Sequence, residues 1–174
     1  MRSVFTITIL TTTISMFAAE IPLRPEKVSA QTVSEPALLQ AIVHPILRGS
    51  GQIFSGTVLK IEHRNSVSSS SLATTRIRFR VDQAVLNVRR GQVVEVTEWG
   101  GLWQSGERYR PGERVLLFLY PPSKLGLTSP VGNRAGRFPV DGIGRVIVRG
   151  PIGQPAQPIE IRRIVAAIRQ AERE

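Results

Sequence analysis

Residues 106–123 decide the fold, and they read Gly-Glu-Arg-Tyr-Arg-Pro-Gly-Glu-Arg-Val-Leu-Leu-Phe-Leu-Tyr-Pro-Pro-Ser. Within this stretch, five consecutive apolar residues, Val115 to Leu119, follow a polar turn and precede two prolines. A short apolar run between turn signals predicts a strand that is buried on both faces. Pro111 and Gly112 suit the second and third positions of a type II turn, because proline presets one φ and glycine accepts a positive φ. We expect the rest of the chain to pair with this strand or to cover it.

A hairpin is expected upstream of this strand. Apolar and polar residues alternate most regularly over Arg76–Asp82, which predicts a half-buried strand. Residues Gln92–Glu98 are expected to return as its antiparallel partner after a turn. The residues expected to face inward from these two strands are Ile77, Phe79, Val81, Val94 and Val96.

Three further strands are expected on either side. Ile53–Glu62 is the first strand of the chain, and Gly56 within it indicates a bulge or a sharp bend. Arg137–Val140 and Gly144–Arg149 are expected to form a second hairpin around an Asp141-Gly142 turn. Short strands separated by turn signals are typical of a small barrel or sandwich.

A helix is expected at each end of the β region. The first has Ser34 as its N-cap and Pro36 in its first turn. Pro45 is expected to limit it, and Gly49-Ser50-Gly51 is expected to end the segment. The second covers about residues 159–172 and carries isoleucine or valine at i, i+3, i+4 and i+7. We expect this amphipathic helix to dock on the β domain, with membrane-surface binding as the alternative.

Residues 52–120 resemble the netrin-like fold, the OB-type barrel of the tissue inhibitors of metalloproteinases. The matching elements are Ile53 to Val58, Arg78 to Val81, Gly91 to Thr97, and Tyr109 to Phe118. In those inhibitors an N-terminal cysteine chelates the protease zinc, and this chain has no cysteine. The resemblance therefore implies a barrel and no activity. Residues 121–140 also resemble uncharacterised secreted bacterial proteins, which implies no function.

The fold class expected from these patterns is mainly β: a small antiparallel OB-like, netrin-like barrel with an N-terminal helix and a C-terminal amphipathic helix. The length of 174 residues is typical of one domain. The expected segments are a signal peptide at 1–30, an N-terminal helical segment at 31–51, the β-barrel domain at 52–149, and a linker with the C-terminal helix at 150–174.

The start of the chain indicates export. Arg2 provides a basic start, and Val4–Ala19 is apolar or small without a charge, as in a secretory signal peptide. Cleavage is expected after Ala19 or after Ala30, and retention of the run as a membrane anchor is the alternative. The lack of cysteine excludes disulfides and thiolate chemistry. An exported protein without cysteine suggests a secreted or periplasmic protein of a bacterial envelope.

The chain is strongly basic, with a net charge of +10 from 23 Lys and Arg against 13 Asp and Glu. Almost all of the basic residues are arginine. This excess suits an anionic partner such as nucleic acid, anionic lipid or an acidic glycan. The alternative is a genome rich in arginine codons together with a solvated surface, and the spread of arginines along the chain favours it.

Two groups of residues are candidates for binding. The first is a corner that would present Trp99, Trp103, Arg108, Tyr109 and Arg110. The second is a sheet face that would present Arg76, Arg78 and Arg80. OB-type barrels bind single strands with basic grooves and stacking aromatics. In the alternative interpretation the tryptophans plug the barrel end, and the arginines pair across strands with Asp82, Glu95 and Glu98.

Residues suited to catalysis are few. His44 and His63 are the only histidines, and no further ligands at metal-binding spacing accompany them. Gly-x-Ser-x-Gly is absent. Four carboxylates are expected near one barrel end, either as a hydrolytic pair or as solvated rim charges: Glu95, Glu98, Glu107 and Glu113.

The leading hypothesis is an exported, non-enzymatic binding module without cofactor or metal. Its partner would be an unknown protein or an anionic polymer, held by the corner and by the Gly- and Pro-rich loop at residues 121–136. The first alternative is an OB-type barrel that binds nucleic acid or an acidic polymer through the arginine face. The second alternative is a secreted hydrolase.

Overall fold

The computed structural model describes residues 34–66, 72–104, 106, 108–149 and 155–173. These residues belong to one compact unit, Val33–Glu174, and the expected signal peptide lies outside them. Among the described residues, no helix is long and apolar enough to cross a membrane.

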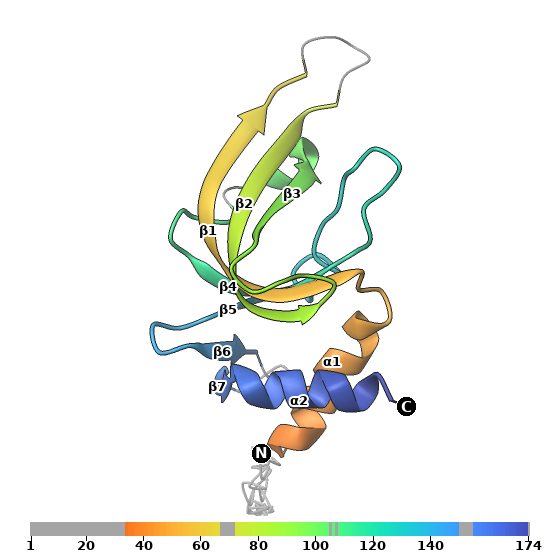
Figure 1. Ribbon diagram of the computed structural model, residues 1–174, viewed down its shortest axis with the longest axis vertical. Coiled ribbons are helices and arrows are strands. Elements are labelled where there is room, and N and C mark those ends of the chain that lie inside the picture. Colours follow the sequence, from red (N-terminus) through yellow and green to blue (C-terminus); the bar gives the residue numbers. More distant parts are fainter. Residues whose placement is uncertain (1–33, 67–71, 105, 107, 150–154, 174) are drawn as a thin grey trace, which may run out of the picture. The chain divides into compact units, whose positions relative to one another are not determined.

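The described chain is mainly antiparallel β with a helix at each end, which confirms the coarse fold class (Figure 1). A five-stranded sheet has the order β3-β2-β1-β4-β5, and β6 and β7 form a separate pair. The elements are α1 (Glu35–Leu47), β1 (Gln52–Arg64), β2 (Thr74–Leu86), β3 (Val93–Trp99), the 3-10 turn η1 (Gly100–Trp103), β4 (Arg114–Leu119), β5 (Arg137–Pro139), β6 (Arg145–Val148), β7 (Gln157–Glu160) and α2 (Ile161–Ala171).

Strand β4 lies between two hydrophobic cores, because its successive side chains point to opposite faces. Leu116 and Phe118 join the core that α1 and α2 cover, together with Ile53 of β1. The alternate residues of β4 join a second core with the inward side chains of β2 and β3. Every residue from Val115 to Leu119 has no exposed surface, so the prediction of a strand buried on both faces is confirmed. The five inward residues predicted for β2 and β3 are buried as well.

Strand β1 is irregular at Gly56, as its sequence predicted. The register between β1 and β2 shifts between Ser55 and Gly56, which marks a bulge. A Cβ atom at Gly56 would lie 2.8 Å from the carbonyl oxygen of Arg80 and 3.2 Å from the ring of Phe54. Only glycine therefore allows β1 to approach β2 this closely.

The expectation that Pro45 limits the first helix is wrong, because α1 continues to Leu47. A proline removes one intrahelical hydrogen bond and crowds the preceding turn. Here the loss falls in the last turn, and Ile46 beyond the proline is buried in the helix-covered core. Ser34 occupies the N-cap position as expected, but its side chain makes no capping hydrogen bond.

The second expected hairpin is reduced to one isolated bridge between Val140 and Val146. Strand β6 pairs instead with β7, in a segment that the sequence assigned to a linker and to the start of a helix. The predicted turn is present, since the Asp141 carboxylate accepts hydrogen bonds from the backbone N–H groups of Ile143 and Arg145. Residues 157–160 form strand β7 and not the first turn of the helix, because Ile159 buries its side chain in the helix-covered core. Helix α2 begins only at Ile161.

The loop after β4 reaches the free edge of β3. The backbone N–H of Tyr120 bonds the Ser129 carbonyl, so the chain folds back beside the end of β4. On the return, the backbone N–H of Thr128 donates a 2.9 Å hydrogen bond to the Thr97 carbonyl of β3. This contact links the two ends of the series β3-β2-β1-β4.

Candidate functional site

The expected binding corner is built around a buried carboxylate, Glu98. Glu98 continues the inward alternation of Val94 and Val96 along β3, and it has no exposed surface. The Trp103 indole Nε1 donates a 3.0 Å hydrogen bond to Oε2, and the Tyr109 hydroxyl donates a 3.3 Å hydrogen bond to Oε1. The expectation of Glu98 as a solvated rim charge is therefore wrong. We call Glu98, Trp103, Tyr109 and Arg108 the corner cluster.

Arginines surround this carboxylate and its tyrosine. The Arg108 Nε lies 3.1 Å from Glu98 Oε2. The Arg137 guanidinium lies over the Tyr109 ring, with Cζ 4.6 Å from the ring centroid, and its Nη2 is 2.5 Å from Glu113. Burial raises the pKa of the Glu98 carboxyl above its usual value, and Arg108 and the two hydrogen bonds only partly oppose this shift. Burial, followed by the neighbouring Glu98 charge, also raises the pKa of Tyr109.

The corner cluster uses its polar groups internally, so it offers little to a partner. Of the candidate residues, Trp103, Arg108 and Tyr109 meet at Glu98. Trp99 stands apart with 51% of its surface exposed. The backbone N–H of Arg110 bonds the Glu113 carboxylate. Glu107, the fourth expected rim carboxylate, lies outside the described residues.

The expected arginine face is partly neutralised by carboxylates. Arg76 and Arg78 of β2 lie 3.0 and 3.3 Å from the same Glu95 carboxylate on β3. Arg78 and Glu95 are direct register partners, as cross-strand charge pairing requires. Arg80, the third member, is 3.5 Å from Asp82 and belongs to a different surface.

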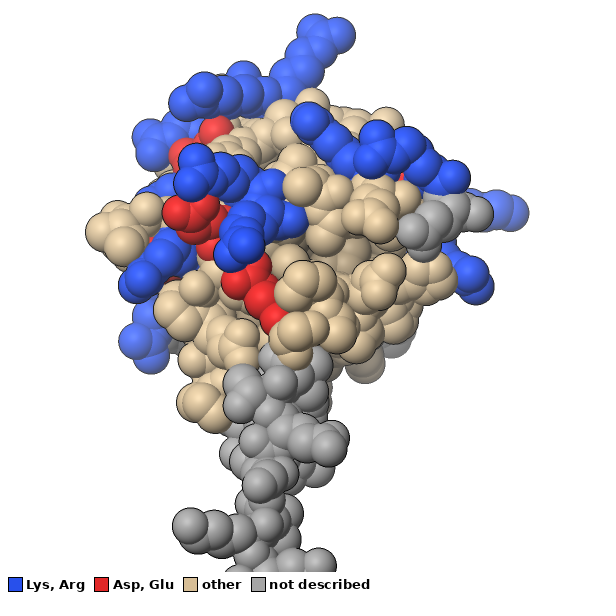
Figure 2. Space-filling model, turned by 90° about the horizontal axis from the view of Figure 1, so that it is seen from below, with Lys and Arg blue, Asp and Glu red and all other residues tan. Residues whose placement is uncertain are grey.

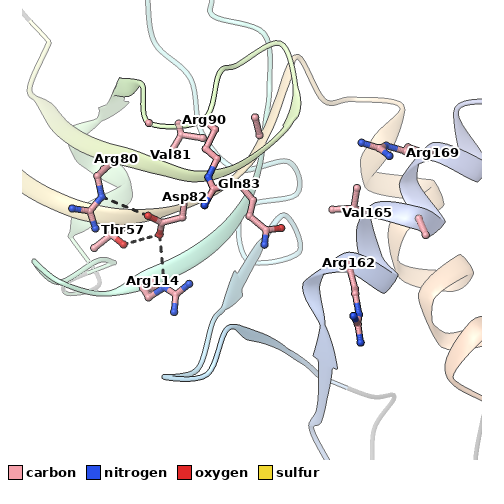
Figure 3. A pocket seen from close by; sticks show the side chains of 13 residues that line it. Thr57, Arg80, Val81, Asp82, Gln83, Arg90, Arg114, Arg162, Val165 and Arg169 are labelled. Atoms are coloured by element: carbon pink, nitrogen blue, oxygen red, sulfur yellow. Dashed lines mark hydrogen bonds and ion pairs between the residues drawn. The ribbon is translucent and has the colours of Figure 1, made fainter.

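That surface is a cleft of about 1020 Å³ between the sheet and α2 (Figure 3). Its sheet side is formed by β1, β2, the β2–β3 turn and β4, and its other side by α2. Five arginines and a single carboxylate, Asp82, line it. The arginines are Arg80, Arg90, Arg114, Arg162 and Arg169. We call this site the arginine cleft.

Three of the five cleft arginines form ion pairs, and these pairs are either long or well exposed. Asp82 Oδ2 accepts a 2.7 Å hydrogen bond from the Thr57 hydroxyl, while Arg80 and Arg114 lie 3.5 and 3.7 Å from the carboxylate. On α2, Arg162 pairs with Glu160 at 2.5 Å, and both side chains are well exposed. Exposed pairs of this kind contribute little energy and can exchange for a ligand.

Two of the cleft arginines are exposed and have no ion pair within the described part of the chain: Arg90 and Arg169. A surface view shows the wider pattern, in which acidic side chains gather beside one group of basic side chains while others project from uncharged surface (Figure 2). The arginine cleft therefore carries an excess of positive charge that the protein itself does not neutralise.

Sequence reasoning found only Arg80 among the five cleft arginines. The others come from a turn, the first residue of β4 and the helix α2. One signal was available: Arg162 and Arg169 are seven residues apart, which places them on one face of a helix, two turns apart. The packing of α2 beside the sheet was not accessible from periodicity.

The histidines take no part in this cleft. The His63 Nδ1 lies 3.0 Å from the Thr75 hydroxyl, and its ring meets the edge of Trp103 with 5.0 Å between centroids. His44 lines a smaller groove between α1 and α2. Among the described residues, no group of three or more His, Asp or Glu side chains is placed to hold a metal ion.

Comparisons of the chain with protein-family models, with curated proteins and with solved structures find no match. The fold and the site define a mainly antiparallel β protein with two terminal helices and an arginine-lined cleft.

Proposed function

We propose that this protein is a non-enzymatic binding module that holds an anionic partner in the arginine cleft. The observation that carries the proposal is the composition of the cleft, five arginines against one aspartate. Guanidinium groups bind carboxylates, sulfates and phosphates with paired hydrogen bonds, and they remain charged at every physiological pH. A concave surface of one charge also concentrates anions near it.

The site differs from the two that the sequence suggested. The corner cluster binds its own carboxylate, and Arg76 and Arg78 share Glu95. The proposed partner is still anionic, but the proposed binding surface is the one between the sheet and α2.

We further propose that β1 to β4 form an OB-like barrel of the netrin-like type. The hydrogen bond from Thr128 to Thr97 supports this reading, because it joins the loop after β4 to the edge of β3. Closure removes the free edge of a sheet, which otherwise invites pairing with other chains. We also propose that residues 1–30 direct export to the bacterial envelope or beyond it.

The test compares a variant that lacks two charges of the cleft with a variant that lacks two charges elsewhere on the surface. The cleft variant is Arg90→Gln with Arg169→Gln. The control is Arg134→Gln with Arg149→Gln, which are exposed arginines outside the cleft with the same lack of ion pairs among the described residues. Binding of fluorescent dextran sulfate is measured by anisotropy at several salt concentrations.

Each cleft arginine that contacts the polymer should contribute about one unit to the slope of log affinity against log salt. We expect the cleft variant to lose about two units of slope and the control to lose much less. Equal losses in the two variants would show that net charge alone drives binding, and would overturn the proposal.

A further inference from the structure

The arginine cleft contains polar groups that a purely electrostatic site does not need. Asp82 lies among the arginines with 21% of its side chain exposed, and its carboxylate is directed toward Thr57, Arg80 and Arg114 on the sheet side of the cleft (Figure 3). Gln83, the next residue of β2, is exposed and lines the same cleft. A carboxylate repels an anion but accepts hydrogen bonds from hydroxyl groups, and an amide both donates and accepts them. The cleft therefore suits a ligand that carries hydroxyl groups beside its anionic groups.

The cleft also lacks the groups that bind bases. None of the described residues that line it is aromatic. Proteins that bind single-stranded nucleic acid without sequence preference stack the bases on aromatic side chains, and this stacking supplies much of the affinity. The apolar part of the lining is aliphatic and small, for example Val165 and Ala166 of α2. The lining thus disfavours nucleic acid.

The positions of the arginines suit an extended ligand. Arg162 and Arg169 are seven residues apart on α2, which corresponds to roughly 10 Å along the helix. Arg80, Arg90 and Arg114 stand on the opposite side, on the sheet and its β2–β3 turn (Figure 3). A volume of about 1020 Å³ is at the upper end of the range for small-molecule sites. A ligand that engages both sides needs several anionic groups distributed along its length.

We propose that the arginine cleft binds a segment of a carboxylated polysaccharide, an inference that rests on the proposed function. Its carboxylates pair with the arginines on both sides of the cleft. Its hydroxyl groups donate to Asp82 and exchange hydrogen bonds with Gln83. Asp82 then has two effects. It lies close enough to Arg80 and Arg114 to pair with them, and it selects against anions that lack hydroxyl donors.

The experiment compares polygalacturonate with poly-L-glutamate, single-stranded DNA and polyphosphate at equal numbers of charges. Poly-L-glutamate isolates the hydroxyl contribution, because it carries carboxylates without hydroxyl groups. We expect polygalacturonate to bind most tightly. Gln83→Ala should weaken polygalacturonate about threefold, the usual effect of one neutral hydrogen bond, and leave poly-L-glutamate unchanged.

Asp82→Asn is the second variant. It removes the repulsion, so poly-L-glutamate and polyphosphate should bind more tightly. Polygalacturonate should gain less, because an NH2 donor replaces one of the two carboxylate oxygens that accept from its hydroxyl groups. Circular dichroism checks the fold, since Asp82 also accepts the Thr57 hydrogen bond. Gln83 has no such internal bond among the described residues, so Gln83→Ala keeps the test decisive if Asp82→Asn is unstable.

The outcomes separate the two proposals. If the Arg90 and Arg169 variant weakens every polymer but polygalacturonate has no advantage, the ligand class is wrong and anion binding in the cleft stands. Tighter binding of single-stranded DNA would likewise reject the polysaccharide. If the variant changes none of the affinities, the cleft is not the site and both proposals fail.

Discussion

The Trp103 indole Nε1 lies 3.0 Å from Oε2 of Glu98 and donates a hydrogen bond to a carboxylate with no exposed surface. A buried charge without its donors is costly, so this bond fixes the turn after β3 to the core. The two tryptophans of the chain thus have different roles, because Trp99 is half exposed and makes no such bond among the described residues.

Substitution of the two tryptophans should separate these roles. Trp103→Phe removes a donor to a buried carboxylate, so we expect it to lower the free energy of unfolding by about 2–3 kcal/mol. Trp99→Phe keeps an aromatic ring at an exposed position and should change it by less than about 0.5 kcal/mol. Urea unfolding, followed by far-UV circular dichroism, measures both.

A double-mutant cycle with Glu98→Gln tests the cause. If the hydrogen bond to the charged carboxylate is responsible, the loss of unfolding free energy on Trp103→Phe should be smaller by at least about 1 kcal/mol when residue 98 is Gln. The same cost in both backgrounds would assign the loss to packing against His63 and Tyr109 instead.

Glu98 also predicts a pH dependence of stability. Its pKa is raised in the folded protein from an ordinary value of 4.5, mainly by burial. Folding therefore favours the protonated form of Glu98. Its contribution to the free energy of unfolding is fully present below pH 4.5 and is lost as the pH rises through the raised pKa. Relative to Glu98→Gln, the wild-type protein should lose unfolding free energy as the pH rises.

The measurement is urea unfolding of both proteins across this pH range. Glu62 and Asp141 have lowered pKa values, so their contributions are lost as the pH falls. Both residues are present in the two proteins, and their effects cancel in the difference. A difference that is flat or that grows with pH would contradict a raised pKa for Glu98.

Gly56 gives a prediction about the bend of β1. A Cβ atom there would lie 2.8 Å from the Arg80 carbonyl oxygen, and this neighbour is backbone that cannot easily move. Gly56→Ala should therefore cost about 1–3 kcal/mol of unfolding free energy. Gly142→Ala is the control, because its Cβ would meet nothing within 4 Å. A small effect at both positions would mean that β1 can shift away from β2.

The sequence predicted the parts of the fold that depend on local periodicity. The Val115–Leu119 run and the Ile77, Phe79, Val81 alternation identified buried strands because burial imposes a period on each strand. The same alternation places Glu98 inward, but a carboxylate is so seldom buried that its residue type favours an exposed rim position. Periodicity carries no information about which elements meet in space.

The binding site was less accessible for that reason. Three of the arginines of the cleft come from the sheet and its turn, and two from a helix far along the chain. Their charges add only because α2 packs beside the sheet through Ile164 and Ile168. The pairing of Arg76 and Arg78 with one glutamate likewise depends on the register between β2 and β3.

Pro45 supplies a prediction about helix α1. It lies inside the helix on an exposed position, where it removes a backbone donor and crowds the preceding turn. Pro45→Ala should raise the free energy of unfolding by about 1–2 kcal/mol, because the restored hydrogen bond outweighs the greater entropy of the unfolded chain. Pro36→Ala is the control, since a proline in the first turn removes no intrahelical bond, and it should give no gain. Thermal and urea unfolding measure both variants. Equal changes in unfolding free energy for the two variants would show that Pro45 does not destabilise α1. The packing of Ile46 alone would then determine where the helix ends.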